Sequence, residues 1–148
     1  MSIRVALIGN PNSGKTTLFN ALTGSHQFVG NWPGVTIEKK TGNYKNQDFQ
    51  CEIIDLPGIY SLSTISLEEE VTTNFIKNQE MDCIINIVDA SNLERNLFLT
   101  LQLLDTNIPM VVALNCMDIV EKQLANINTV KLEQALGVKV IPDRKSVV

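Results

Sequence analysis

Residues 9–16 read Gly-Asn-Pro-Asn-Ser-Gly-Lys-Thr, the residue types and spacing of a loop that wraps the phosphates of a nucleotide. The glycines allow backbone conformations in which successive N–H groups turn toward one anion. Lys15 brings a positive charge to the outer phosphates, and the hydroxyl of Thr16 is placed to bind Mg²⁺. A helix that begins here points its positive end at the same phosphates. The residues predicted to bind nucleotide are Gly9, Asn10, Pro11, Asn12, Ser13, Gly14, Lys15, Thr16 and Thr17.

Residues 55–58 read Asp-Leu-Pro-Gly and form a second motif after a strand-like segment. The carboxylate of Asp55 is suited to hold Mg²⁺ through water, and the N–H of Gly58 to face the γ-phosphate. Thr36 offers another hydroxyl, so we predict Thr16, Thr36 and Asp55 as the Mg²⁺ ligands. The residues that we predict to join the nucleotide site here are Gly34, Val35, Thr36, Asp55, Leu56, Pro57 and Gly58.

A third motif at residues 115–118 reads Asn-Cys-Met-Asp and predicts recognition of the base. The carboxylate of Asp118 can accept hydrogen bonds from both N1–H and N2–H of guanine, and adenine has no such pair of donors. A mismatched base leaves a buried carboxylate unpaired, so the motif favours GTP over ATP. The residues predicted to contact the base are Asn115, Cys116, Met117 and Asp118.

The segments around the motifs alternate between strand and helix patterns. The apolar run at 3–8 precedes the first motif, and a helix pattern after it ends at Gly24. Residues 82–88 and 109–114 are typical of buried parallel strands. These patterns predict an α/β fold with a mainly parallel sheet and helices on both faces. The carboxyl ends of the strands then bring the three motifs to one crevice.

Residues 25–36 have no helical period and carry two Gly and a Pro, which predicts a long functional loop beside the phosphate site. Strand patterns near 37–46 and 49–55 flank a turn at 46–48 and predict an antiparallel hairpin. We expect this hairpin to supply one antiparallel edge strand to the sheet.

Two helices further along the chain have recognisable start signals. Ser66 with Glu69, and Ser91 with Glu94, each predict a capping box at a helix N-terminus. In the second helix, leucines recur at helical spacing and predict the stripe that packs on the sheet. This stripe consists of Leu93, Leu97, Leu101 and Leu104.

Length and composition exclude several classes of protein. The chain has 148 residues, enough for one domain with a substantial core, and a net charge of −4 without a basic cluster argues against nucleic-acid binding. No apolar run is long enough to cross a bilayer, and no signal peptide is apparent. The three cysteines are widely spaced in or beside apolar runs, so we expect buried, reduced thiols.

The motifs resemble those of the translation-factor-class GTPases and, more closely, the N-terminal GTPase domain of the FeoB family of bacterial ferrous iron transporters. The resemblance covers nearly the whole chain. Its most specific parts are residues 9–20, the segment Val-Gly-Asn-Trp-Pro-Gly-Val-Thr at 29–36, and the segment Val-Asp-Ala-Ser-Asn-Leu-Glu-Arg-Asn-Leu at 88–97. It implies a P-loop GTPase (Ras-like) fold over residues 1–148.

The resemblance also implies a function and partners. The domain would bind GTP and GDP, hydrolyse GTP slowly, and regulate or drive Fe(II) uptake by a membrane-embedded transport domain of the same full-length protein. It would lie at the cytoplasmic side of a bacterial inner membrane, with this fragment itself soluble. Small accessory Feo proteins and a homo-oligomer are left open as partners.

Two residues sharpen the mechanism that the resemblance implies. Asn12 stands where related potassium-activated GTPases place an asparagine that helps to bind K⁺, together with backbone carbonyls around Asn31 and Trp32. Ile59 stands where Ras-like enzymes carry a glutamine that orients water, so backbone groups must take over that role. The residues expected to act on the reaction are Lys15, Asn12, Thr36 and Gly58.

The sequence departs from the family pattern in two places. Cys116 replaces a lysine that packs along the nucleotide in many GTPases, so affinity for GTP is expected to be modest. After residue 142, the base-contacting loop is unrecognisable, and the domain is expected to stop before its final helix with apolar sheet surface exposed. Two alternatives stay open, namely a nucleotide-binding switch with negligible hydrolysis of its own and a ribosome- or tRNA-associated GTPase.

Overall fold

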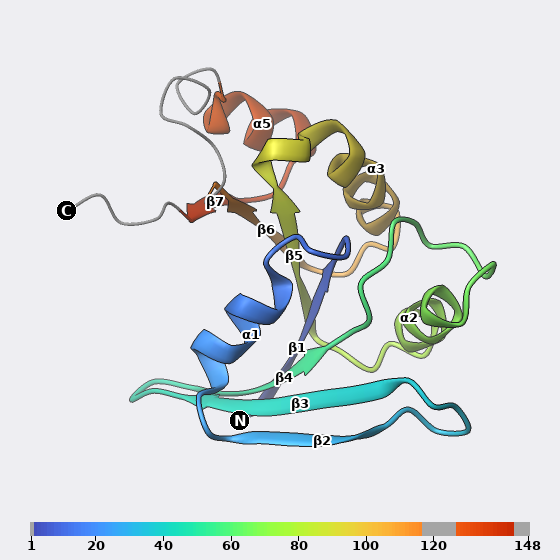
Figure 1. Ribbon diagram of the computed structural model, residues 1–148. Coiled ribbons are helices and arrows are strands. Elements are labelled where there is room, and N and C mark those ends of the chain that lie inside the picture. The colour runs from blue at the N-terminus through green and yellow to red at the C-terminus, as the bar shows by residue number, and fades with distance from the viewer. Residues whose placement is uncertain (1, 117–126, 144–148) are drawn as a thin grey trace.

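The computed structural model describes residues 2–116 and 127–143. The described residues form a seven-stranded sheet in the order β2-β3-β4-β1-β5-β6-β7, with helices on both of its faces (Figure 1). The strands are β1 (Ser2–Gly9), β2 (Gln27–Asn31), β3 (Glu38–Lys45), β4 (Gln50–Asp55), β5 (Cys83–Asp89), β6 (Met110–Asn115) and β7 (Val140–Asp143). The helices are α1 (Lys15–Thr23), α2 (Leu67–Lys77), a 3₁₀ turn η1 (Ala90–Asn92), α3 (Leu93–Leu104) and α5 (Thr129–Leu136).

The parallel part of the sheet brings the ends of distant strands together. β1 pairs in parallel with β4 and with β5, so that Leu7 lies opposite Asp55 and Gly9 opposite Ile87. β6 continues the sheet beyond β5 and ends at Asn115. The carboxyl ends of β1, β4 and β6 therefore meet at one edge, as the mainly parallel prediction requires.

The antiparallel part of the sheet differs from the prediction. Residues 27–31 form the strand β2, which pairs antiparallel with β3, so the prediction of a loop over all of 25–36 was wrong. The antiparallel edge thus consists of two strands, and β3 lies between β2 and β4. Phe28 and Val29 are both exposed, so β2 lacks the alternation of apolar and polar residues that marks a half-buried strand. Its backbone pairing with β3 forms the strand nonetheless.

Helices cover the sheet with two separate apolar cores. On one face, Phe19 of α1 packs against Val5, Leu7 and Ile53. On the other face, α2, α3 and α5 pack over β1, β4, β5 and β6, and Phe75 of α2 lies in this larger core (Figure 1). Gly24 ends α1, as predicted from the sequence, and Gly137 ends α5.

Most of the predicted leucine stripe of α3 faces the core, because Leu93, Leu97 and Leu104 pack against it. Leu99 and Leu103 are fully buried, whereas Leu101 is 56% exposed. Two polar residues share the buried face, because Thr100 bonds to Asn86 of β5 and the side-chain oxygen of Asn96 accepts from the backbone of Asp89. These hydrogen bonds turn polar positions inward, which apolar periodicity alone does not reveal.

The two predicted helix caps have opposite outcomes. The hydroxyl of Ser66 accepts from the N–H of Glu69 at 3.1 Å, which confirms Ser66 as the helix cap, and the carboxylate of Glu69 accepts from the same hydroxyl at 2.9 Å. The second prediction was wrong, because Asp89 caps the short 3₁₀ turn by accepting from the N–H of Ser91, and α3 begins only at Leu93. The N-cap residue of α3 is Asn92, which makes no side-chain capping bond.

Burial of the cysteines agrees with reduced thiols. Cys51 and Cys116 are buried, Cys83 is half-buried, and the three form no disulfide with one another. Burial raises the pKa of the Cys51 and Cys83 thiols, which disfavours the reactive thiolate. Among the described helices, none has the length and apolar character to cross a membrane.

The burial pattern of α3 generates a stability prediction. Leu99→Ala removes a fully buried side chain and should lower the free energy of unfolding by about 2–5 kcal/mol. Leu101→Ala, two residues away on an exposed position, should change it by no more than about 0.5 kcal/mol. Urea unfolding of both variants measures the difference. Equal losses would contradict the observed orientation of the helix.

Candidate nucleotide-binding site

A cavity of ≈ 500 Å³ opens at the carboxyl ends of the parallel strands, beside the N-terminus of α1. Residues of the first motif form most of its wall, and the second and third motifs each contribute one residue. The residues that line it are Asn10, Pro11, Asn12, Gly14, Lys15, Thr16, Thr17, Gly58 and Asn115. The structure thus brings three separate segments of the chain to one cavity, and it does so around a helix N-terminus, which favours an anion.

Close packing explains the glycines of the first motif. A Cβ on Gly9 would lie 2.7 Å from the carbonyl oxygen of Ile87. Gly14 has φ +101°, and a Cβ there would overlap the side-chain amide of Asn115. That amide donates to the carbonyl of Ser13 at 2.8 Å, so the end of β6 is bonded directly to the loop. These contacts fix the shape of the loop.

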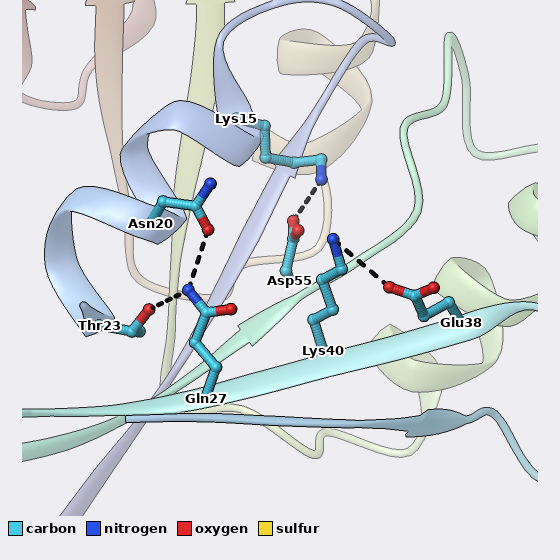
Figure 2. A network of polar contacts seen from close by, with 7 residues as sticks. All are labelled: Lys15, Asn20, Thr23, Gln27, Glu38, Lys40 and Asp55. Carbon is cyan, nitrogen blue, oxygen red and sulfur yellow. Dashed lines mark hydrogen bonds and ion pairs between the residues drawn. The ribbon is translucent and has the colours of Figure 1, made fainter. Parts of the chain in front are cut away.

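Lys15 and Asp55 form a buried ion pair at the cavity. The Nζ of Lys15, at the start of α1, bonds to Oδ1 of Asp55, at the end of β4, and Figure 2 shows the two side chains pointing toward each other. The carboxylate of Asp55 and the hydroxyl of Thr16 are hard oxygen donors of the kind that Mg²⁺ prefers. Their chemistry fits a magnesium ion bound together with phosphates.

The second motif contributes through one residue. Gly58 lines the cavity, and a Cβ on it would come within 3.0 Å of the Cα of Pro11. The neighbouring side chains of Leu56 and Ile59 are instead buried in the core. Pro57 is half-buried and does not line the cavity. Only a glycine allows the backbone of this segment to lie so close to the first motif.

Residues 34–36 do not line this cavity in the structure. They lie in the turn between β2 and β3, where Thr36 is exposed and the N–H of Val35 donates to the carbonyl of Trp32 at 3.2 Å. The turn is anchored by Trp32, whose buried ring packs edge-on against Phe75 of α2 at 5.5 Å between centroids. Sequence reasoning missed this anchor, although a tryptophan inside a polar loop is a signal for one.

The start of β2 is bonded to α1. Figure 2 shows the amide of Gln27 between two α1 side chains, where it donates to Asn20 at 2.9 Å and to Thr23 at 3.0 Å. The chain that leaves α1 is therefore held at Gln27 and again at Trp32. The sequence prediction did not include either contact.

Residues 60–66 are bonded to α2 and α3. The guanidinium of Arg95 lies 4.5 Å from the ring centroid of Tyr60 and donates to its hydroxyl. The carboxylate of Glu69 accepts from the hydroxyls of Ser61, Ser63 and Ser66. The hydrogen bonds from Ser63 and Ser66 hold the pKa of Glu69 below its usual value.

The other residues of the third motif do not line the cavity or lie outside the described residues. Cys116 is buried and does not line the cavity, and Met117 and Asp118 lie outside the described residues. A more apolar pocket of ≈ 350 Å³ adjoins the first cavity and shares Gly14, Thr17 and Asn115 with it. Ile87, Ala113 and Ile141 of the sheet line this second pocket beside α1.

Comparisons with known proteins agree with this geometry. The model of the family described as ferrous iron transport protein B matches residues 3–146. The Fe(2+) transporter FeoB of Escherichia coli (strain K12) is 56% identical over 144 residues, which are 95% of this chain and 19% of that protein. This chain therefore spans about a fifth of the length of the curated relatives it matches.

Solved structures are similar over nearly all of the chain. A mutant of S. thermophilus NFeoB bound to GDP is 54% identical with a TM-score of 0.88, over 96% of this chain and 56% of that one. The G domain of the T. maritima FeoB iron transporter is 37% identical with a TM-score of 0.88, over 97% of this chain and 88% of that one. The expected P-loop GTPase fold is thereby confirmed. These matches do not support the ribosome- or tRNA-associated alternative.

The serine contacts of Glu69 predict a dependence of stability on pH. Because its pKa is lowered on folding, the contribution of Glu69 is present above its ordinary pKa of about 4.3 and is lost as pH falls through the lower folded value. Glu69→Gln should therefore lower Tm at neutral pH, and the difference from wild type should shrink in acid. Glu70→Gln, exposed on the same helix turn, is the control. A difference independent of pH would contradict this assignment.

Proposed function

This chain belongs to the ferrous iron transport protein B family, and we propose that it binds GTP and GDP and slowly hydrolyses GTP. The observation that carries the proposal is the cavity at the N-terminus of α1, where Lys15, Thr16 and Gly58 meet. The GDP that is bound in the similar S. thermophilus structure supports the identity of the nucleotide.

Each part of the cavity has a task in this proposal. Lys15 and the N-terminus of α1 offset the negative charge of the phosphates. Thr16 and Asp55 hold the magnesium ion, which when bound neutralises charge on the outer phosphates. Thr36 serves as a third ligand after the turn between β2 and β3 moves toward the cavity. The N–H of Gly58 faces the γ-phosphate.

Slow hydrolysis follows from the residue after Gly58. The side chain of Ile59 is 2% exposed and aliphatic, so it cannot orient a water molecule. Backbone groups near Gly58 and Thr36 must hold the attacking water instead. A catalytic group that orients water through a side chain is absent from this position, which is consistent with a low turnover number.

Potassium is the second ion of the proposal. Asn12 is exposed, lines the cavity and has φ +63°, so its side chain is available at the phosphate end of the site. K⁺ held there would offset charge that develops between the β- and γ-phosphates. The carbonyl of Trp32, a proposed further ligand, accepts from Val35 in this structure, so its participation requires the turn to rearrange.

Guanine recognition and coupling to transport complete the proposal. Asn115 and Asp118 read the base, with Asn115 at the cavity and Asp118 outside the described residues. The relatives transport Fe(2+), and we assign to this domain the regulation of such transport by a membrane-embedded part of the same protein. Accessory Feo proteins and self-association belong to the same proposal as partners. The domain then works on the cytoplasmic side of the membrane.

Loss of the phosphate-binding charge tests nucleotide binding. Lys15→Ala should weaken the binding of GDP and GTP by about 10- to 100-fold, because the phosphates lose a charged hydrogen bond. Titration with a fluorescent nucleotide measures the affinity. Lys77→Ala, an exposed lysine at the end of α2, is the control and should bind as wild type does. Tight binding by Lys15→Ala would refute the loop assignment.

The potassium site is tested by hydrolysis in two salts. Wild type should release phosphate faster in KCl than in NaCl at equal ionic strength and with Mg²⁺ present. Asn12→Ala should lose this difference and keep its affinity for GDP. Stimulation that persists in Asn12→Ala would place the ion elsewhere, and no hydrolysis by wild type in either salt would reduce the domain to a nucleotide-binding switch.

A further inference from the structure

We propose that the side-chain amide of Asn10 is a positioning residue for GTP hydrolysis, because it fixes the backbone at Gly58 and Ile59 against the phosphate-binding loop. This inference rests on the proposed GTPase function. It assigns to Asn10 a role that differs from phosphate binding by the backbone of the same loop. The segment that Asn10 holds, Gly58 and Ile59, must orient the attacking water through backbone groups because it has no glutamine side chain.

Two hydrogen bonds hold Ile59 to successive residues of the loop. The Nδ2 of Asn10 donates to the carbonyl of Ile59 at 2.8 Å, and the N–H of Ile59 donates to the carbonyl of Gly9 at 3.0 Å. Asn10 is only 2% exposed, so the first of these bonds is shielded from water. The peptide groups on both sides of Ile59 are thereby fixed.

Packing adds to this restraint on the preceding residue. Gly58 lies so close to Pro11 that a Cβ would come within 3.0 Å of its Cα and 3.1 Å of its N. The side chain of Ile59 is anchored in the core at the same time. Gly58 therefore has little freedom to move relative to the phosphate-binding loop.

The contacts change partner immediately after Ile59. Tyr60 bonds to Arg95 of α3, and the N–H of Leu62 donates to Gln102 of α3 at 2.8 Å. Gly58 and Ile59 thus contact the phosphate-binding loop, whereas the residues from 60 onward are bonded to α2 and α3. The Asn10 bond lies at this boundary and keeps movement beyond it from displacing Gly58.

A comparison with Asn86 indicates that stability is not the reason for Asn10. Asn86 makes the same kind of bond one strand away, from its Nδ2 to the carbonyl of Ile8 at 3.0 Å, and its oxygen accepts from Thr100. The Oδ1 of Asn10 is buried and has no hydrogen-bond partner among the described residues. A buried acceptor of this kind opposes folding, so a stabilising role alone does not explain the residue.

The test compares Asn10→Ala with Asn86→Ala. Asn10→Ala should lower kcat for GTP by about 10- to 100-fold, since misplacement of reacting groups by about 1 Å has such effects. Its Kd for GDP should change little. Asn86→Ala should lower Tm, because it removes the buried hydrogen bonds that Asn86 makes to Ile8 and Thr100, and should keep the wild-type kcat.

Three results would overturn the proposal. These are an unchanged kcat in Asn10→Ala, an equal loss of kcat in both variants, and a loss of GDP affinity that accounts for the whole effect. If wild type does not hydrolyse GTP, the proposed hydrolysis is refuted, and the role of Asn10 is tested by nucleotide affinity instead. Asn10→Ala should then still lose affinity for a non-hydrolysable GTP analogue relative to GDP, and an unchanged ratio of the two affinities refutes the role of Asn10.

Hydrogen exchange of wild type provides a measurement that does not depend on the folding of a variant. With GDP bound, the N–H of Ile59 should exchange slowly, and the amides of residues 60 and 61 should exchange faster. Fast exchange at Ile59 would show that the backbone there is not held, which contradicts the positioning role.

Discussion

The parallel pairing of β1 with both β4 and β5 is the constraint on which the candidate site depends. Asp55 reaches Lys15, which lines the cavity, because β4 lies beside β1 in the register that places Leu7 opposite Asp55. Gly9 can contact the carbonyl of Ile87 only because β5 lies on the other side of β1. A slip of one residue in either pairing would turn every side chain of that strand to the opposite face. The apolar faces of β1 and β5 therefore specify the geometry of polar groups at their ends.

Buried polar groups gather at this same end of the sheet. Lys15 and Asp55 neutralise each other, Asn86 bonds to β1 and α3, and Asn10 bonds to Ile59. Such groups lose hydration on folding, and each bond in a shielded environment is stronger than it would be in water. The bonds of Lys15 and Asn10 hold the phosphate-binding loop to β4 and to Ile59. The two apolar cores supply the stability that allows these groups to be buried.

Local patterns were sufficient to predict some elements of the fold. Residues 9–24 contain both the loop and the helix with its stop, and the turn at Asn46 is made by its own side chain, which accepts from Asp48 and Phe49. These structures depend on residues that are close in sequence. The convergence of the motifs also followed from the sequence, because parallel strands have their carboxyl ends on one edge. The roles of Asn12 and Thr36 stay predictions.

Contacts between distant segments explain what the sequence did not reveal. The strand β2 forms by pairing with β3, although its own residues show no strand pattern. The buried face of α3 includes Asn96 and Thr100, whose partners lie on another element, so a stripe of leucines omits them and includes the exposed Leu101. The sequence identified Asn10 only as one of the loop residues predicted to bind nucleotide. The partner of its side chain, Ile59, lies on a distant segment of the chain. In each case the decisive group belongs to a neighbour that apolar periodicity does not identify.

The turn that carries Thr36 and the segment after Gly58 are each held by an aromatic side chain. Trp32 packs on Phe75 of α2, and Tyr60 contacts Arg95 of α3. For Thr36 to reach the cavity, the turn must move and the Trp32 contact must be broken or carried along with α2. Exposing a buried side chain of this size costs about 2–3 kcal/mol or more. A nucleotide shifts such an equilibrium only by its difference in affinity for the two arrangements, so contacts of Thr36 with the bound ion must exceed that cost. The packing energy of Trp32 therefore sets how much more tightly GTP must bind to the moved turn than to the present arrangement before this segment moves.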